Sequence, residues 1–139
     1  MMISLLVRDY MQQQPLIFHP QQSLAQVVQQ LLEHQQLGGP VCDDEGHLLG
    51  WISEKDCLAH LLDETYHCEL VSLACDIMHK NVLSVSPDMS VLTLAEMAIG
   101  DKPKMYPVVA ENRLVGMITR REMLIAFAKQ LDECFIPHR

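Results

Sequence analysis

The chain has 139 residues, of which 49% are hydrophobic and 20% charged, so it can bury the core of one compact domain or of two small fused units. A formal net charge of −8 weighs against DNA or RNA binding, which normally needs a basic face, and no apolar run is long enough to cross a membrane. The N-terminus lacks the basic lead-in of a signal peptide, and the five cysteines form no Cys-x-x-Cys pair. We therefore expect a cytoplasmic protein with reduced thiols.

The first predicted elements are a short strand and an amphipathic helix. Residues 16–18 form an apolar run closed by Pro20, which is consistent with a buried strand. Ser23 has the position of a helix cap, and the apolar residues after it recur at intervals of three and four. We expect this helix to end at Gly38-Gly39.

A hairpin and a second helix follow. Residues 41–42 and 48–52 are predicted strands, and the acidic segment 43–46 ends in glycine, as a turn does. Asp56 is expected to open the next helix. The apolar residues that we expect this helix to bury are Leu58, Leu61 and Leu62.

The second half of the chain repeats this order. It predicts a strand at 82–85, a helix from Val91 to Gly100, and a hairpin of strands 108–109 and 114–118 that turns at Glu111-Asn112. The residues that we expect the last helix to bury are Met123, Leu124, Phe127, Ala128 and Leu131.

The two halves keep a constant register. Four landmarks recur 67 positions later: an Asp-x-Met segment, a residue before proline, a Ser-hydrophobic helix start, and a Pro-Val pair. The matched segments are Asp9–Met11 with Asp76–Met78, His19-Pro20 with Ser86-Pro87, Ser23-Leu24 with Ser90-Val91, and Pro40-Val41 with Pro107-Val108. Such a register indicates an internal duplication. We therefore expect an α/β (α+β) fold of two β-α-β-β-α repeats, packed with pseudo-twofold symmetry into one module.

A further duplicated segment ends each hairpin. Gly50-Trp51-Ile52-Ser53-Glu54-Lys55-Asp56 returns as Gly116–Glu122, now 66 positions later. In both copies a hydroxyl residue precedes a carboxylate by three positions, which is the spacing of a helix N-cap. The same groups can bind a ligand, because a hydroxyl and free backbone N–H groups suit a phosphate, and a carboxylate accepts hydrogen bonds from ribose hydroxyls. The spacing alone leaves both interpretations open.

The full series of motifs resembles the cystathionine-β-synthase (CBS) domain, and two in tandem resemble a Bateman module. On this resemblance, repeat 1 spans 5–62, a linker 63–71, repeat 2 spans 72–128, and a C-terminal tail 129–139. The resemblance implies a pair, usually a dimer forming a flat disc, that binds adenine-type nucleotides in clefts between repeats and regulates another protein. Ligands across that family include AMP, ADP, ATP and S-adenosylmethionine, and some members bind nothing known.

The resemblance also implies roles for the two duplicated turns. In the family, the acid of the Ser/Thr-x-x-Asp motif usually takes the ribose hydroxyls, and the Ser/Thr lies near the phosphate. Ser53 and Asp56 match this pattern fully. Thr119 also matches, but Glu122 replaces the aspartate and adds one methylene, so we expect its reach toward a ribose to differ.

The segment before Pro-Val usually lines the adenine pocket in this family. Repeat 1 has Gly38-Gly39 there, followed by Pro40, so we expect either a roomier pocket or a weaker grip on the base. Repeat 2 has Lys104-Met105-Tyr106 there, and Tyr106 can stack on a base or belong to the core.

Three cations lie within the duplicated turns. Lys55 and Arg121 occupy the same place in the two repeats, and Arg120 lies beside Arg121. Arginine suits bidentate phosphate contact, but these residues can equally form a solvated face or a salt bridge within a dimer. The small number of basic residues favours a mono- or diphosphate over a triphosphate.

Other chemistry has weaker support in the sequence. Cys57, His60, His67 and Cys68 lie near the link between the repeats, but their spacing is not that of a structural zinc site, so we expect no metal. No segment orients a catalytic triad, and no Gly-x-x-x-x-Gly-Lys occurs, so we expect no enzyme and no required cofactor.

The leading prediction is a regulatory module that binds an adenosine-containing nucleotide as its ligand, forms a homodimer and signals to an unknown effector protein. We expect the output to lie in another chain, with no nucleic acid and no membrane insertion. The alternative is a ligand-free dimeric scaffold. Glu122 and the two glycines favour the scaffold, and the intact Ser53–Asp56 pair opposes it.

Overall fold

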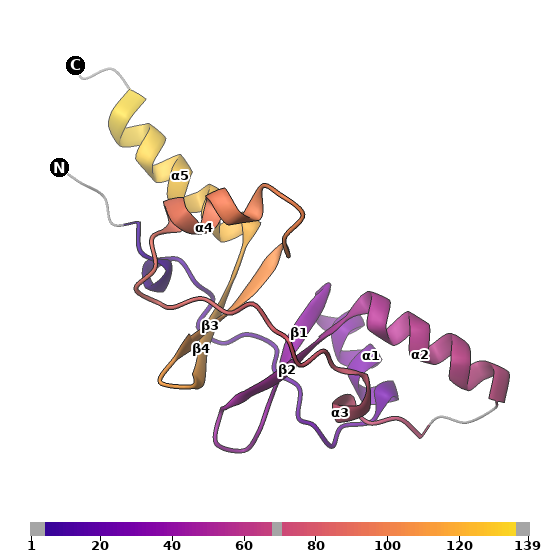
Figure 1. The fold of residues 1–139 in the computed structure, drawn as a ribbon. Coiled ribbons are helices and arrows are strands. Elements are labelled where there is room, and N and C mark those ends of the chain that lie inside the picture. The colour runs from indigo at the N-terminus through magenta and orange to yellow at the C-terminus, as the bar shows by residue number, and fades with distance from the viewer. Residues whose placement is uncertain (1–4, 68–70, 136–139) are drawn as a thin grey trace. The chain divides into compact units, whose positions relative to one another are not determined.

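The computed structural model describes residues 5–67 and 71–135, which group into two compact units (Figure 1). The first-repeat unit contains the described residues of 15–82 together with 112–114. The second-repeat unit contains the described residues of 1–14, 83–111 and 115–139. Each unit is an α/β assembly of one hairpin and the helices that pack on it.

The elements of the first-repeat unit follow the predicted order. They are α1 (Leu24–His34), β1 (Gly38–Cys42), β2 (Leu48–Ser53), α2 (Glu54–His67) and α3 (Ala74–Ile77). Strands β1 and β2 pair antiparallel, with Gly38 opposite Ser53 and Pro40 opposite Trp51. The predicted strand at 16–18 is reduced to one parallel bridge, between Phe18 and Val41.

The second-repeat unit has the same plan. It contains a 3-10 helix η1 (Val7–Asp9), α4 (Val91–Ala98), β3 (Met105–Ala110), most of β4 (Arg113–Thr119) and α5 (Arg120–Phe135). Glu111 and Asn112 both have positive φ, at 52° and 66°, as the central residues of a tight type I′ hairpin turn do. The predicted strand at 82–85 is again a single parallel bridge, between Val85 and Val108.

Each repeat has a lead-in segment, which is its Asp-x-Met sequence and the residue that follows, Gln12 or His79. This lead-in segment pairs with the hairpin of the other repeat. In the first-repeat unit, Trp51 and His79 exchange two backbone hydrogen bonds, of 2.9 and 2.8 Å. In the second-repeat unit, Gln12 and Met117 do the same, at 2.7 and 3.0 Å. The Asp-x-Met segments therefore lie beside β2 and β4, next to the turn that carries the other repeat's acid.

A capping box starts α1 as predicted. The Ser23 hydroxyl accepts a hydrogen bond from the Gln26 N–H at 3.1 Å, and the Gln26 side chain accepts one from the Ser23 N–H at 3.0 Å. The predicted end of this helix was wrong: α1 ends at His34, because Gln35 adopts a left-handed conformation with φ 53°. Gly38 and Gly39 lie in β1 instead.

Each unit has its own core. In the first-repeat unit the buried cluster is Phe18, Leu24, Val27, Leu31, Val41, Ile52, Cys57, Ala74 and Ile77. In the second it is Val7, Val85, Val91, Leu94, Ala98, Tyr106, Val108, Ile118, Met123 and Ala126. None of the described helices is long and apolar enough to span a membrane.

Part of the predicted helix burial was wrong. The Leu58 and Leu62 side chains of α2 are exposed, and so are Leu124, Ala128 and Leu131 of α5. Met123 is buried as predicted, and Cys57 and Ala126, which were not predicted, are buried as well. Each of these two helices therefore has apolar side chains that its own unit does not cover.

Candidate functional site

The β2–α2 turn holds the Ser53–Asp56 pair as a reciprocal cap. One carboxylate oxygen of Asp56, Oδ2, accepts hydrogen bonds from the Ser53 N–H at 2.9 Å and the Ser53 hydroxyl at 2.8 Å. The Asp56 N–H donates to the Ser53 oxygen at 3.2 Å. Only 12% of the Asp56 side chain is exposed, so this carboxylate is a preorganised acceptor at the start of α2.

The β4–α5 turn repeats this geometry with a longer acid. Glu122 Oε1 accepts from the Thr119 N–H and from the Thr119 hydroxyl, both at 2.8 Å. The Thr119 oxygen accepts from the Arg121 N–H at 3.2 Å. Glu122 is buried, whereas Asp56 is only partly buried, so the second acid is more enclosed than the first.

Each acid contacts one further side chain that the sequence reading missed. His79 Nε2 lies 2.7 Å from Asp56 Oδ1. In the second-repeat unit, the Gln12 amide nitrogen lies 3.4 Å from both carboxylate oxygens of Glu122. His79 and Gln12 are 67 positions apart, each directly after an Asp-x-Met segment, so the register of the duplication is the signal that could have paired them.

The glycines of the duplicated turns make room for these lead-in segments. A Cβ on Gly50 would lie 2.6 Å from the His79 carbonyl oxygen and 2.7 Å from the Met78 sulfur. A Cβ on Gly116 would meet the Gln12 oxygen and the Met11 sulfur at 2.7 Å each. Glycine therefore permits the close approach that brings His79 and Gln12 to the acids.

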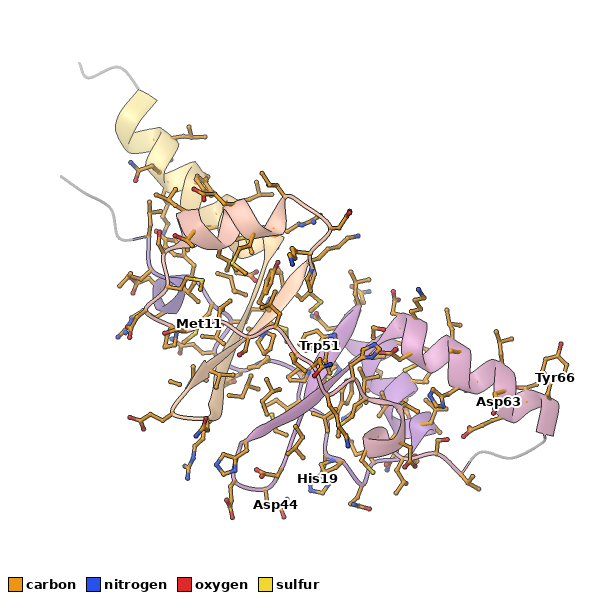
Figure 2. The ribbon with its side chains drawn as sticks, viewed as in Figure 1. Met11, His19, Asp44, Trp51, Asp63 and Tyr66 are labelled. Atoms are coloured by element: carbon orange, nitrogen blue, oxygen red, sulfur yellow. The ribbon has the colours of Figure 1, made fainter. Side chains whose placement is uncertain are left out.

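The expected empty space at Gly38-Gly39 is filled by aromatic side chains. A Cβ on Gly38 would lie 2.7 Å from the Trp51 indole nitrogen, and one on Gly39 would lie 2.9 Å from the Phe18 ring. Figure 2 shows Trp51 against the β1–β2 hairpin. Because Gly39 and Pro40 are both buried, this strand presents packed backbone and offers no roomier pocket.

Tyr106 is a core residue in this structure. Tyr106 corresponds to Gly39 in the first repeat, and Val85 corresponds to Phe18. Each core therefore contains one large aromatic ring of this pair of positions, Phe18 in the first-repeat unit and Tyr106 in the second. The Tyr106 ring is fully buried and therefore has no face free to stack on a base. Its hydroxyl has no hydrogen-bond partner among the residues that the structure describes, and burial raises the pKa of this phenol.

The three cations differ in their surroundings. Lys55 and Arg121 are exposed at the starts of α2 and α5. The Arg120 guanidinium donates to the Ala98 carbonyl oxygen at 2.8 Å, so it caps the end of α4. Lys55 and Arg121 are therefore the more available cations for an anionic ligand.

Each unit also has an apolar groove between its helices. The first, of about 460 Å³, is lined by residues of α1 and α2, among them Leu32, Glu54, Leu58 and Leu61. The second, of about 410 Å³, is lined by their counterparts Ile99, Arg120, Leu124 and Phe127. Neither groove includes the carboxylates of the two turns.

The β1–β2 turn gathers Asp43, Glu45 and His47, whose ligand atoms lie within 4.8 Å of one another. Asp43 accepts hydrogen bonds from the backbone N–H groups of Glu45 and His47, both at 2.9 Å. The bond from the His47 backbone is the main reason that the pKa of Asp43 is lowered. These contacts are those of an ordinary Asx turn.

The residues weighed for zinc are described only in part. Cys57 is buried in the core of the first-repeat unit, and its thiol pKa is raised to about 11 by burial and by the nearby Asp56 and Glu54. Cys68 and the side chain of His67 lie outside the described residues.

The chain is similar to segments of longer proteins. It is 30% identical over 131 residues to the A-adding tRNA nucleotidyltransferase of Aquifex aeolicus, covering 94% of this chain and 15% of that protein. It is 25% identical over 118 residues to the uncharacterized protein MJ1225 of Methanocaldococcus jannaschii, covering 85% of this chain and 41% of that protein. The chain thus spans less than half of the length of these two curated relatives.

Several solved structures have the same fold over most of the chain. The putative acetoin utilization protein AcuB from Vibrio cholerae has a TM-score of 0.83 at 25% identity, covering 97% of this chain and 100% of that one. CBSX2 in complex with AMP has a TM-score of 0.79 at 25% identity, covering 90% and 97%. The CBS domain pair of MJ0100, solved with 5′-methylthioadenosine and S-adenosyl-L-methionine, has a TM-score of 0.75 at 25% identity, covering 90% and 97%.

The family comparison agrees with the duplication seen in the sequence and in the fold. The CBS domain matches twice, at residues 7–63 and 74–129. These two matches cover most of the chain and confirm the resemblance inferred from its motifs. The chain belongs to the CBS-domain family and carries two CBS domains in tandem.

Proposed function

We propose that this CBS pair senses an adenosine-containing ligand, such as AMP, ADP, ATP or S-adenosylmethionine, at the Ser53–Asp56 turn and signals its presence to a partner protein. The observation that carries the proposal is the preorganised Asp56 carboxylate, held by Ser53 at the start of α2. The AMP and S-adenosyl-L-methionine complexes of two similar CBS pairs support this class of ligand.

The chemistry of the turn fits a ribose. Asp56 Oδ2 is used by the cap, whereas Oδ1 contacts only His79 among the interactions described above. A pair of vicinal hydroxyls donates well to a carboxylate that the fold already holds in place. Exposed Lys55 in the first turn of α2 adds a cation for a phosphate.

The second-repeat turn is proposed as the weaker site. Glu122 is more enclosed than Asp56, and both of its oxygens face the Gln12 amide. Any ligand there would have to displace Gln12 from a carboxylate that Thr119 also holds. Of the cations, Arg121 is better placed than Arg120, whose guanidinium is engaged with Ala98.

The proposed mechanism is regulatory and not catalytic. Ligand binding shifts the population between arrangements of the protein only through its different affinity for each. We propose that the signalling form is a homodimer, because both helix grooves carry large exposed side chains that a second copy would cover. These residues are Leu32, Leu58, Ile99 and Leu124.

A ligand-free scaffold is the second candidate, and one observation favours it. Both acids are already satisfied within the protein, Asp56 by Ser53 and His79, and Glu122 by Thr119 and Gln12. A carboxylate with this many partners can serve as a structural cap with no ligand.

Calorimetric titration with AMP separates the two candidates. We expect wild-type protein to bind AMP, Asp56→Ala to bind at least tenfold more weakly, and Glu122→Ala to bind almost as well as wild type. Asp56→Asn serves as a second variant, because it removes the charge while keeping an oxygen for the Ser53 cap. Absence of binding by AMP, ADP, ATP and S-adenosylmethionine to a folded wild-type protein would support the scaffold instead.

A further inference from the structure

The Asp56 carboxylate contacts an imidazole, that of His79, whereas the matching acid of the other unit, Glu122, contacts the amide of Gln12. His79 Nε2 lies 2.7 Å from Asp56 Oδ1, with 61% of the His79 side chain exposed and 12% of Asp56. Two backbone hydrogen bonds between His79 and Trp51 hold the backbone of His79 beside β2.

Gln12 provides an internal comparison for His79. Its backbone is held by Met117 as that of His79 is held by Trp51, and its side chain approaches Glu122 at 3.4 Å. The two units thus place a hydrogen-bond donor beside each acid in the same way. The Gln12 amide is neutral throughout the physiological pH range, whereas the imidazole of His79 can take up a proton and become a cation.

Asp56 is the acid whose carboxylate contacts the His79 imidazole. The adjoining strand β2 (Leu48–Ser53) contains no ionisable side chain. The neighbouring cations are Lys80, next in the chain, and Lys55, next to Asp56 in α2, and both are exposed. Glu54 is exposed one residue earlier in α2. The ion pair with Asp56 is the contact that protonation of His79 strengthens.

We propose that His79 is a further residue of the Ser53–Asp56 site, where it competes with the ligand's hydroxyls for Asp56 Oδ1. This inference rests on the proposed function. A protonated His79 makes a charge-assisted hydrogen bond to this oxygen, so the neutral hydroxyls of the ligand compete with it for the same acceptor. Binding at this site therefore weakens as pH falls, and binding at the Thr119–Glu122 turn does not.

Adenosine is the suitable probe, because it lacks the phosphate that itself ionises near pH 6. Trp51 is the one tryptophan of the sequence and pairs with His79 through the backbone, so its fluorescence reports on this site. Dissociation constants are measured at pH 6 and pH 8 for wild type and for His79→Gln, which installs the residue type of Gln12. His79→Ala is the second variant if the first does not fold.

We expect wild-type protein to bind adenosine roughly three- to tenfold more weakly at pH 6 than at pH 8, which corresponds to displacement of about a quarter to a half of a proton on average over this range. Both His79 variants should bind with nearly equal affinity at the two pH values, and at pH 6 they should bind more tightly than wild type. A variant that keeps the wild-type pH dependence would overturn the role of His79 while leaving the ligand proposal intact. No binding of adenosine or AMP by wild type at either pH would overturn both.

Discussion

At the scale of single residues, Gly50 and Gly116 allow the backbone of another segment to lie close to each duplicated turn. We predict that Gly50→Ala destabilises the protein by about 1–3 kcal/mol, because the added Cβ would lie 2.6 Å from the His79 carbonyl oxygen. Urea unfolding followed by circular dichroism measures this change. Gly100→Ala is the control, since a Cβ there meets nothing within 4 Å, and equal stability of the two variants would contradict the account.

The buried thiols give a second prediction at this scale. Burial is the main reason that the pKa values of Cys42 and Cys57 rise from 9.0 to about 11. At pH 8 both thiols should therefore react with iodoacetamide much more slowly in the folded protein than Cys75, which is partly exposed. Mass mapping of the modified peptides measures the order, and rapid labelling of Cys57 before Cys75 would contradict the assigned burial.

The raised pKa values of Cys42 and Cys57 also make the stability of the folded protein depend on pH. The pKa of each thiol is higher in the folded state than the ordinary value of 9.0, so the folded state holds the proton more tightly. The resulting contribution to stability is complete below about pH 9 and is lost as the pH rises toward 11. Unfolding should thus become easier over this window.

The sequence predicts some residues of the candidate site and misses others for identifiable reasons. Ser53 and Asp56 are close in the chain, so their spacing alone predicts the cap that the structure shows. His79 reaches Asp56 only because each lead-in segment pairs with the other repeat's hairpin, and local spacing carries no trace of that pairing. The sequence leaves Tyr106 open between a base platform and a core residue, and its burial in the core beside Val85 is visible only in three dimensions.

At the scale of elements, capping fixes where the first helix starts. Ser23→Ala removes the acceptor for the Gln26 N–H, so we expect a loss of about 1 kcal/mol in the free energy of unfolding. Urea denaturation checks the value. Thr93→Ala is the matched control, because this hydroxyl residue is exposed within α4, and we expect it to change stability by only a few tenths of a kcal/mol. A Ser23→Ala change as small as the control would argue against the cap.

The element order follows the predicted pattern, and the departures have a physical cause. Hairpins and helices are local structures, so turn residues and apolar periodicity suffice to locate them. Residues 16–18 and 82–85 each form one bridge only, with Val41 and Val108, so an apolar run alone predicts more strand than the structure forms. Periodicity predicts an apolar face on α2 and α5 but cannot tell whether that face meets its own hairpin or another surface.

The exposed apolar side chains of α2 and α5 concern the association of the whole molecule with a second copy. If a second copy covers them, Leu58→Glu and Leu124→Glu should each weaken the dimer by at least tenfold, because a charge would be buried against apolar side chains. Sedimentation equilibrium measures the association. Gln21→Glu adds the same charge at an exposed position outside the helices and should leave the dimer unchanged. A monomeric wild type, or variants that associate as wild type does, would contradict the proposed interface.

Ligand binding affects the stability of the whole molecule, because a ligand that binds only the folded state stabilises that state. Thermal unfolding against AMP, ADP, ATP and S-adenosylmethionine tests it most directly. A ligand at 100 times its dissociation constant adds about 2.7 kcal/mol, which should raise the melting temperature by several degrees. We predict such a rise with at least one of these ligands, and its loss in Asp56→Ala. Unchanged melting of a folded wild-type protein with all four, or a rise that Asp56→Ala retains in full, would contradict the account.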